Sequence, residues 1–160
     1  MNLLGARVAR DSMGLGLQIG PHRISIDDVV GRWRGIDALV DREVIVGIRA
    51  EAFHHDPAGE FELSVRFHEQ VGAVQWVHAS IDAPVISATH AAGDDRRAED
   101  GLVDDGAPAD LAIVAALEGR GDVNRWAPLR IGVDHSQIYL FDHTGVAIEA
   151  DPGLGGAAAA

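Results

Sequence analysis

The chain is a succession of short apolar segments, separated by turn signals at intervals of roughly eight to twelve residues. Segments of this length and composition favour β-strands, and the absence of any repeating period excludes solenoids and propellers. The sequence therefore predicts a mainly β protein, a small barrel or sandwich. The expected strands are residues 3–9, 14–19, 23–26, 44–48, 60–69, 74–81, 85–88, 111–117, 129–133, 137–141 and 146–148.

The strongest strand signal is the β-branched run at residues 44–48, Val-Ile-Val-Gly-Ile. Gly47 interrupts this run, which predicts a bulge or a close backbone approach at that point. Arg49 and Glu51 follow the strand two residues apart with opposite charges. We expect them to lie on one side and to form a structural ion pair.

Two hairpins are expected. In the segment 60–69, alternate residues from Phe61 to Phe67 are apolar, and the turn at Val71-Gly72 should return the chain along 74–81. The short connection Asp134-His135-Ser136 predicts a tight hairpin between 129–133 and 137–141.

One helix is expected at about residues 28–40. Val29, Trp33, Ile36 and Val40 recur at helical spacing, so they share one face. Trp33 is the side chain expected to pack this helix against the sheet. Gly31 and Gly35 weaken the helix by about 1 kcal/mol each relative to alanine.

The 160 residues predict a single domain at 1–149, with a flexible acidic insertion at 91–110 and a disordered, alanine-rich tail at 150–160. The net charge is −12 and the 13 cationic side chains are all arginine, which argues against nucleic acid and anionic lipid as partners. There is no cysteine and therefore no disulfide bond, thiolate metal site or cysteine nucleophile, which suits a cytoplasmic protein. The longest apolar run, 111–117, is too short to span a membrane.

No catalytic motif is present. A phosphate-binding loop needs a lysine that the chain lacks, and no Gly-x-Ser-x-Gly or His-Glu-x-x-His sequence occurs. The eight histidines include the neighbours His54 and His55, which point to opposite faces of an extended chain, and His68 and His78 on the expected hairpin. We expect exposed polar positions here. The sequence predicts no enzyme, no cofactor and no metal site in this chain.

Four sets of residues occur in a recognisable order. Met1-Asn2-Leu3-Leu4 is followed by Val44 to Glu51, Val-Ile-Val-Gly-Ile-Arg-Ala-Glu. Glu69-Gln70-Val71-Gly72 comes next, with Val77-His78 in its expected partner strand. Leu129 to Asp134 and Tyr139 to Gly145, Tyr-Leu-Phe-Asp-His-Thr-Gly, complete the set. Together they resemble the C-terminal regulatory domain, of the TOBE type, of the ATP-binding subunits of sugar-importing ABC transporters of the maltose and trehalose type. Ala50 and Ala52 depart from the family, which has proline and histidine there.

The resemblance implies an OB-like β-barrel and a non-catalytic role. The domain would pair two ATPase subunits as a homodimer and, as in some members of the family, bind regulatory proteins. ATP and Mg²⁺ would be held by an ATPase domain preceding Met1, which would hydrolyse ATP to drive carbohydrate uptake. That domain would dock on membrane permeases, which would place the chain in the cytoplasm at the inner face of the cell membrane.

Self-association would need an apolar patch in the acidic surface, for which Trp76 and Phe141 are candidates. The residues that match family landmarks are expected to be structural: Gly47, Arg49, Glu51, Gly72, Phe141, Asp142 and Gly145. A free-standing barrel that binds an oxyanion such as molybdate is the alternative, against which the missing lysine, the charge of −12 and the missing internal repeat all count.

Overall fold

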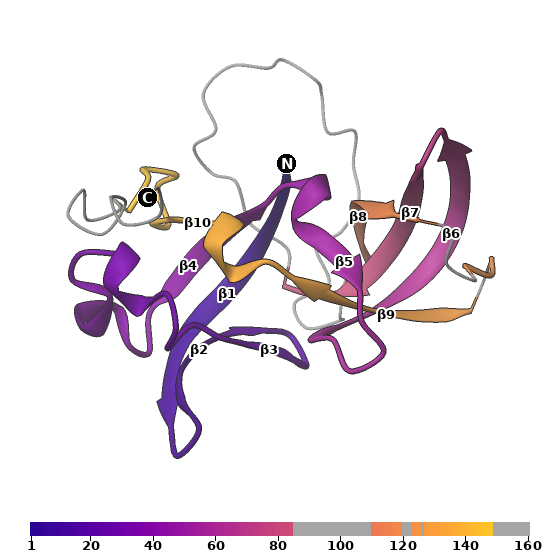
Figure 1. The fold of residues 1–160 in the computed structure, drawn as a ribbon. Coiled ribbons are helices and arrows are strands. Elements are labelled where there is room, and N and C mark those ends of the chain that lie inside the picture. Colours follow the sequence, from indigo (N-terminus) through magenta and orange to yellow (C-terminus); the bar gives the residue numbers. More distant parts are fainter. Residues whose placement is uncertain (85–109, 120–122, 126, 149–160) are drawn as a thin grey trace, which may run out of the picture.

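The computed structural model describes residues 1–84, 110–119, 123–125 and 127–148, and within them the chain forms two antiparallel five-stranded sheets (Figure 1). The first has the order β10 (Ile138–Phe141), β4 (Glu43–Ile48), β1 (Asn2–Asp11), β2 (Gly14–Ile19) and β3 (His22–Ser25). The second has the order β5 (Phe53–His55), β9 (Pro128–Val133), β6 (Phe61–Val71), β7 (Val74–Asp82) and β8 (Asp110–Glu118). The prediction of a mainly β protein is confirmed.

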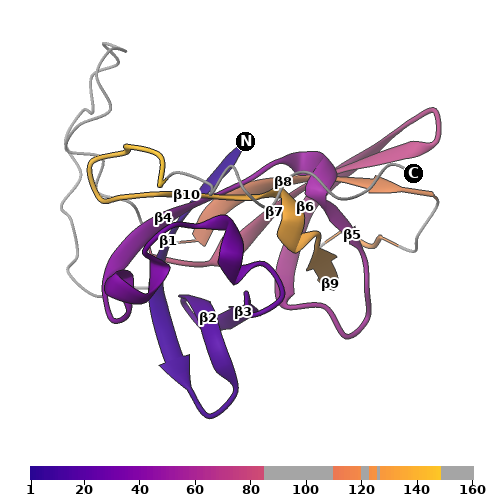
Figure 2. The ribbon, with the colours of Figure 1, turned by 60° about the vertical axis from the view of Figure 1, so that its left-hand side comes forward.

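The second sheet is strongly curled. Its end strands β5 and β8 contact each other although neither is hydrogen-bonded to the other in the sheet order. Such curling brings a sheet close to a barrel. In Figure 2 the end of β1 and the turn that joins it to β2 project away from β10 and β4.

The prediction of one continuous helix at 28–40 is wrong. Two short 3₁₀ helices occupy the segment, η1 (Val30–Arg32) and η2 (Ile36–Leu39). Between them Gly35 adopts a left-handed conformation with φ 75°, which an α-helix cannot contain. Trp33 nevertheless lies in the core with 4% exposure, as expected for the side chain that packs this segment on the sheet.

The hairpin of β6 and β7 is confirmed, with Gly72 at φ 63° in its turn. Phe61, Leu63 and Val65 are buried as their alternation predicts. A register shift between Val65 and Phe67 then exchanges the inward and outward positions along β6. Phe67, which the alternation predicts to be buried, is therefore 46% exposed.

The tight hairpin expected at 134–136 is wrong. β9 belongs to the second sheet and β10 to the first, so the short connection crosses between sheets. The carboxylate of Asp134 accepts hydrogen bonds from the backbone and hydroxyl of Ser136, which starts the 3₁₀ helix η4 (His135–Gln137) and turns the chain away from β9. The segment 146–148 makes an isolated bridge, Ala147 to Phe141, in place of the expected strand.

The core lies between the two sheets and takes large side chains from both. Its fully buried members include Leu4, Leu17, Ile24, Ile48, Phe61, Leu63, Ile81 and Ile113. Phe61 sits near the centre, with its ring edge-on to Phe53 at 5.9 Å and tilted against His22 at 5.6 Å. No helix within the described ranges is long and apolar enough to cross a bilayer.

Three expectations fall mostly or wholly outside the described residues. These are the strand at 85–88, the acidic insertion at 91–110, of which Asp110 begins β8, and the tail at 150–160.

Candidate functional site

Three of the landmark segments, far apart in the sequence, lie side by side as β1, β4 and β10 (Figure 1). Leu3, Gly47 and Tyr139 are partners in one row across the three strands. Gly5, Ile45 and Phe141 form the next row. Residues that share a row and a face contribute to a single continuous surface.

The outward face of these rows is apolar. Leu4, Val46 and Leu140 are at most 2% exposed and point into the core, so their neighbours along each strand point outward. Leu3 is 47% exposed and Tyr139 37% exposed. We call this surface the outer apolar face and define it as Met1, Leu3, Ile45, Gly47, Tyr139 and Phe141.

Gly47 keeps the middle of this face flat. The pairing of β4 with both neighbours continues through Gly47 without a register shift, so the bulge expected there is wrong. A Cβ at this position would lie 2.9 Å from Cε2 of Phe141 and 3.0 Å from Sδ of Met1. The missing side chain therefore makes room for these two side chains.

Arg49 lies beside the outer apolar face and contacts it through its guanidinium. The Cζ atom is 5.4 Å from the centre of the Tyr139 ring, within the range of a cation–π contact. In the described part of the chain Arg49 makes no ion pair with Glu51, which is exposed in the 3₁₀ helix η3 (Ala50–Ala52). The expected ion pair is therefore wrong, and Arg49 is directed to an aromatic ring instead.

The landmark Asp142 organises the turn that follows β10. Its Oδ1 atom accepts hydrogen bonds from the backbone N–H of Thr144 at 2.8 Å, from the hydroxyl of Thr144 at 2.6 Å and from the N–H of Val146 at 3.0 Å. The hydrogen bonds from Thr144 and Val146 lower the pKa of Asp142. Gly145 completes the turn with φ 84°. Asp142 and Gly145 thus shape the turn that follows β10.

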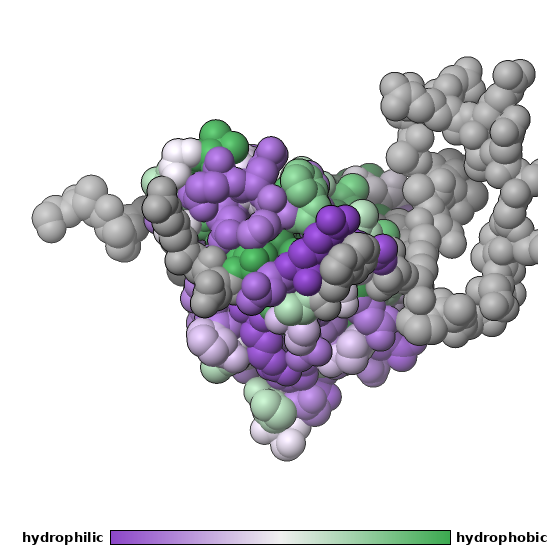
Figure 3. All heavy atoms as spheres, turned by 90° about the vertical axis from the view of Figure 1, so that its right-hand side faces the viewer, coloured by the Kyte–Doolittle hydropathy of each residue, from purple (hydrophilic) through white to green (hydrophobic). Residues whose placement is uncertain are grey.

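Trp76, the other candidate for self-association, lies on the second sheet and does not adjoin Phe141. It is half-buried on β7, opposite Glu69 of β6. The exposed Phe67 and Val71 are on the same hairpin, and the Phe67 ring stacks on His78 at 4.8 Å. Figure 3 faces this side of the molecule, where green hydrophobic residues gather between purple hydrophilic ones.

A cavity of about 440 Å³ adjoins the outer apolar face, where Gly5 of β1 and Ile45 of β4 form part of its lining. Its lining includes Arg7, Gln18, Glu43, Pro84 and His143. Arg7 and Glu43 are partners across β1 and β4, so their opposite charges lie close together at the same rim. This neighbouring carboxylate reduces the attraction of the cavity for an anion.

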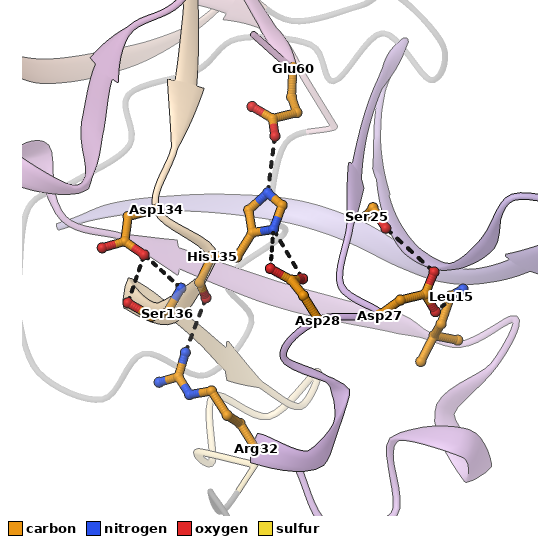
Figure 4. A network of polar contacts seen from close by, with 9 residues as sticks. All are labelled: Leu15, Ser25, Asp27, Asp28, Arg32, Glu60, Asp134, His135 and Ser136. Carbon is orange, nitrogen blue, oxygen red and sulfur yellow. Dashed lines mark hydrogen bonds and ion pairs between the residues drawn. The ribbon is translucent and has the colours of Figure 1, made fainter. Parts of the chain in front are cut away.

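A second polar site joins the two sheets at His135. The Nε2 atom of His135 is 3.0 Å from Oε1 of Glu60, and Nδ1 is 3.2 Å and 3.3 Å from the two carboxylate oxygens of Asp28 (Figure 4). The guanidinium of Arg32 donates to the carbonyl oxygen of His135 at 3.1 Å. Burial lowers the pKa of His135, but the hydrogen bonds to Glu60 and Asp28 outweigh it and raise the pKa above 6.5.

The other histidines in the described ranges are not brought together. His54 and His55 lie on opposite faces of β5, as expected, and His68 contacts Gln75 at 3.2 Å. His22 is packed against Phe61, and burial lowers its pKa. Among the residues whose placement is described, no three histidines, aspartates or glutamates converge as a metal site would require.

Sequence reasoning assigned no role to Asp28, Glu60 or His135. They come from three segments of the chain, and none has a local motif around it that would indicate an interaction. A search of known protein families and a search of curated proteins both find no match to this chain.

Proposed function

We propose that the chain is a non-catalytic regulatory domain that pairs two copies of an ABC sugar-importer ATPase subunit. The proposal rests first on the ordered landmark residues that resemble this family. The mainly β fold is compatible with the OB-like barrel of such domains, to which we assign the curled second sheet. ATP and Mg²⁺ are then bound by a separate ATPase domain, and the whole protein works at the inner face of the cell membrane.

The observation that carries the proposal is the outer apolar face. It is built from three strands that bear landmarks, and it exposes Leu3 and Tyr139 in one row. An exposed apolar surface favours contact with a like surface, because each copy shields the other from water. The net charge of −12 on each copy opposes the contact, so the apolar burial has to outweigh this repulsion. A two-fold contact between outer apolar faces would pair the domains as the family resemblance implies.

The experiment is to measure the mass of the chain in solution by light scattering across a concentration series. We expect a dimer for the unaltered chain and a monomer for the double variant Leu3→Glu and Tyr139→Glu, which places carboxylates in the middle of the contact. Met13→Glu is the matched control, since Met13 is 71% exposed in the turn between β1 and β2 and lies outside the face. A monomeric unaltered chain, or a double variant that remains dimeric, would contradict the proposed pairing.

The link to an ABC transporter is tested separately on the gene. We expect an in-frame Gly-x-x-x-x-Gly-Lys-Ser/Thr sequence and an ABC signature upstream of the Met1 codon. A stop codon and a ribosome-binding site directly before Met1 would contradict the transporter assignment. Titration calorimetry with molybdate tests the oxyanion alternative, to which the pairing of Arg7 with Glu43 at the cavity gives little support.

A further inference from the structure

Both ring nitrogens of His135 face a carboxylate. Glu60 lies at Nε2 and Asp28 at Nδ1, on opposite sides of the ring (Figure 4). An ionised carboxylate accepts hydrogen bonds but donates none, so each ring nitrogen must carry a hydrogen for both contacts to be favourable. The geometry is therefore that of the imidazolium cation.

The neutral ring cannot make both contacts. A neutral imidazole has one N–H and one lone pair, and the lone pair would face a carboxylate oxygen at about hydrogen-bond distance. One contact then becomes repulsive. Asp28 has the longer contact, and its side chain is 64% exposed against 26% for Glu60, so Asp28 moves away more readily into water.

The two carboxylates belong to different parts of the fold. Asp28 leads into η1, whose flanking residue Trp33 packs in the core, and Glu60 directly precedes β6 of the second sheet. His135 itself lies in η4, where the chain crosses from β9 to β10. Three segments meet at one ring, each from a different connection.

Other charged groups of the described residues also lie near the ring. Arg32, on η1, binds the carbonyl oxygen of His135, and its positive charge opposes protonation of the ring. Asp134, on the same turn as His135, is held by Ser136 and Gln137, and its negative charge favours the protonated ring. Asp27 is directed away, to the backbone N–H of Leu15 and to Ser25. The two carboxylates in direct contact therefore dominate.

We propose that His135 is a proton-controlled latch, which when protonated holds the η1 segment to the start of β6 and when neutral releases Asp28. A group with a raised pKa in the folded state stabilises that state fully below its unfolded pKa, about 6.5, and this stabilisation is lost as the pH rises through the folded pKa. The latch is thus closed in acid and opens as the pH rises through the raised pKa of His135. This inference does not depend on the proposed function, because it uses only contacts within one chain.

The experiment is an NMR titration of the intact chain labelled at its histidine rings. We expect His135 to titrate above 6.5, and we expect Asp28→Asn and Glu60→Gln each to lower that value, since each removes one negative charge while keeping the side-chain shape. His143→Gln is the control, because His143 is exposed on the turn after β10. A titration of His135 at or below 6.5, or one that Asp28→Asn leaves unchanged, would overturn the latch.

Hydrogen exchange provides a readout of release. The N–H groups of Val29 and Arg32 bond to the carbonyls of Ile26 and Val29 within the η1 segment. We expect their protection factors, corrected for the intrinsic effect of pH, to fall as the pH rises through the His135 titration. In Asp28→Asn this pH-dependent fall should be absent. Protection that stays constant across the titration in the unaltered chain would also overturn the proposal.

Discussion

The side-chain amide of Asn2 binds both backbone groups of Val114. Its Nδ2 atom donates to the Val114 carbonyl at 2.9 Å, and the Val114 N–H donates to its Oδ1 atom at 2.8 Å. Asn2 also donates to the carbonyl of Ile48 at 3.1 Å. One side chain thus replaces a missing strand partner at the outer edge of β8 and ties the first sheet to the second.

Replacing Asn2 by alanine should therefore loosen both sheets. At about 1 kcal/mol for each of three hydrogen bonds, we expect Asn2→Ala to lower the free energy of unfolding by roughly 1–3 kcal/mol, measured by urea denaturation. The matched control is Asn124→Ala, an exposed asparagine, which should change it by less than about 0.5 kcal/mol. Equal effects of the two variants would contradict the role assigned to Asn2.

Gly59 allows the chain to pass against the backbone of β9. A Cβ there would lie 2.2 Å from the carbonyl carbon and oxygen of Ile131 and 2.4 Å from the nitrogen of Gly132. Because backbone atoms cannot move aside without breaking the sheet, we expect Gly59→Ala to cost at least the roughly 1–3 kcal/mol of an overpacked core. Thermal unfolding tests this against Ala58→Ser on the exposed neighbour. Similar midpoints for both variants would refute it.

His22 and His135 should affect stability with opposite dependence on pH. Burial lowers the pKa of His22, so its contribution is present above about 6.5, the unfolded value, and is lost as the pH falls toward the folded pKa. When the pH is lowered from about 7 to about 5, we expect the free energy of unfolding to fall less in His22→Phe than in the unaltered chain. Urea denaturation at several pH values measures this difference. A His22→Phe variant with the same acid loss as the unaltered chain would contradict it.

The turn after β10 should depend on the carboxylate of Asp142. We expect Asp142→Ala to release the N–H groups of Thr144 and Val146 to hydrogen exchange, whereas Thr144→Ala removes only the hydroxyl contact and should leave them largely protected. Because the pKa of Asp142 is lowered, the unaltered turn should persist below pH 3.8 and loosen only as the pH falls through the folded value. Protection of both amides in Asp142→Ala would show that the turn forms without the carboxylate.

Most strands could be predicted from the sequence because their signals are local. The β-branched run at 44–48 and the alternation from Phe61 to Val65 each occupy one segment, and both segments form strands. The structure of 28–40 could not be predicted correctly, because two short 3₁₀ helices direct the same apolar residues inward as one α-helix would. The left-handed conformation of Gly35 is not visible in that spacing.

The His135 site could not be predicted because it depends on tertiary contacts alone. In the sequence Asp28, Glu60 and His135 are polar residues of the kind that usually lies on the surface between strands. Only the packing of the two sheets brings them together. The same limit explains the wrong hairpin at 134–136. A three-residue connection suggests that the two strands it joins pair with each other. In the structure β10 pairs with β4, and β9 pairs with β6 and β5.

The crossing from β9 to β10 affects how the protein can be made on a ribosome. β4 and β6, which both have a neighbour on each side in their sheets, precede β9 and β10 in the chain. One neighbour of β4 is β10 and one neighbour of β6 is β9, and these two strands emerge among the last described residues. Until then both strands have an unpaired edge, and such edges promote aggregation. Folding during translation is therefore expected to wait for the final segments, so the nascent chain would benefit from a chaperone that shields β4 and β6 meanwhile.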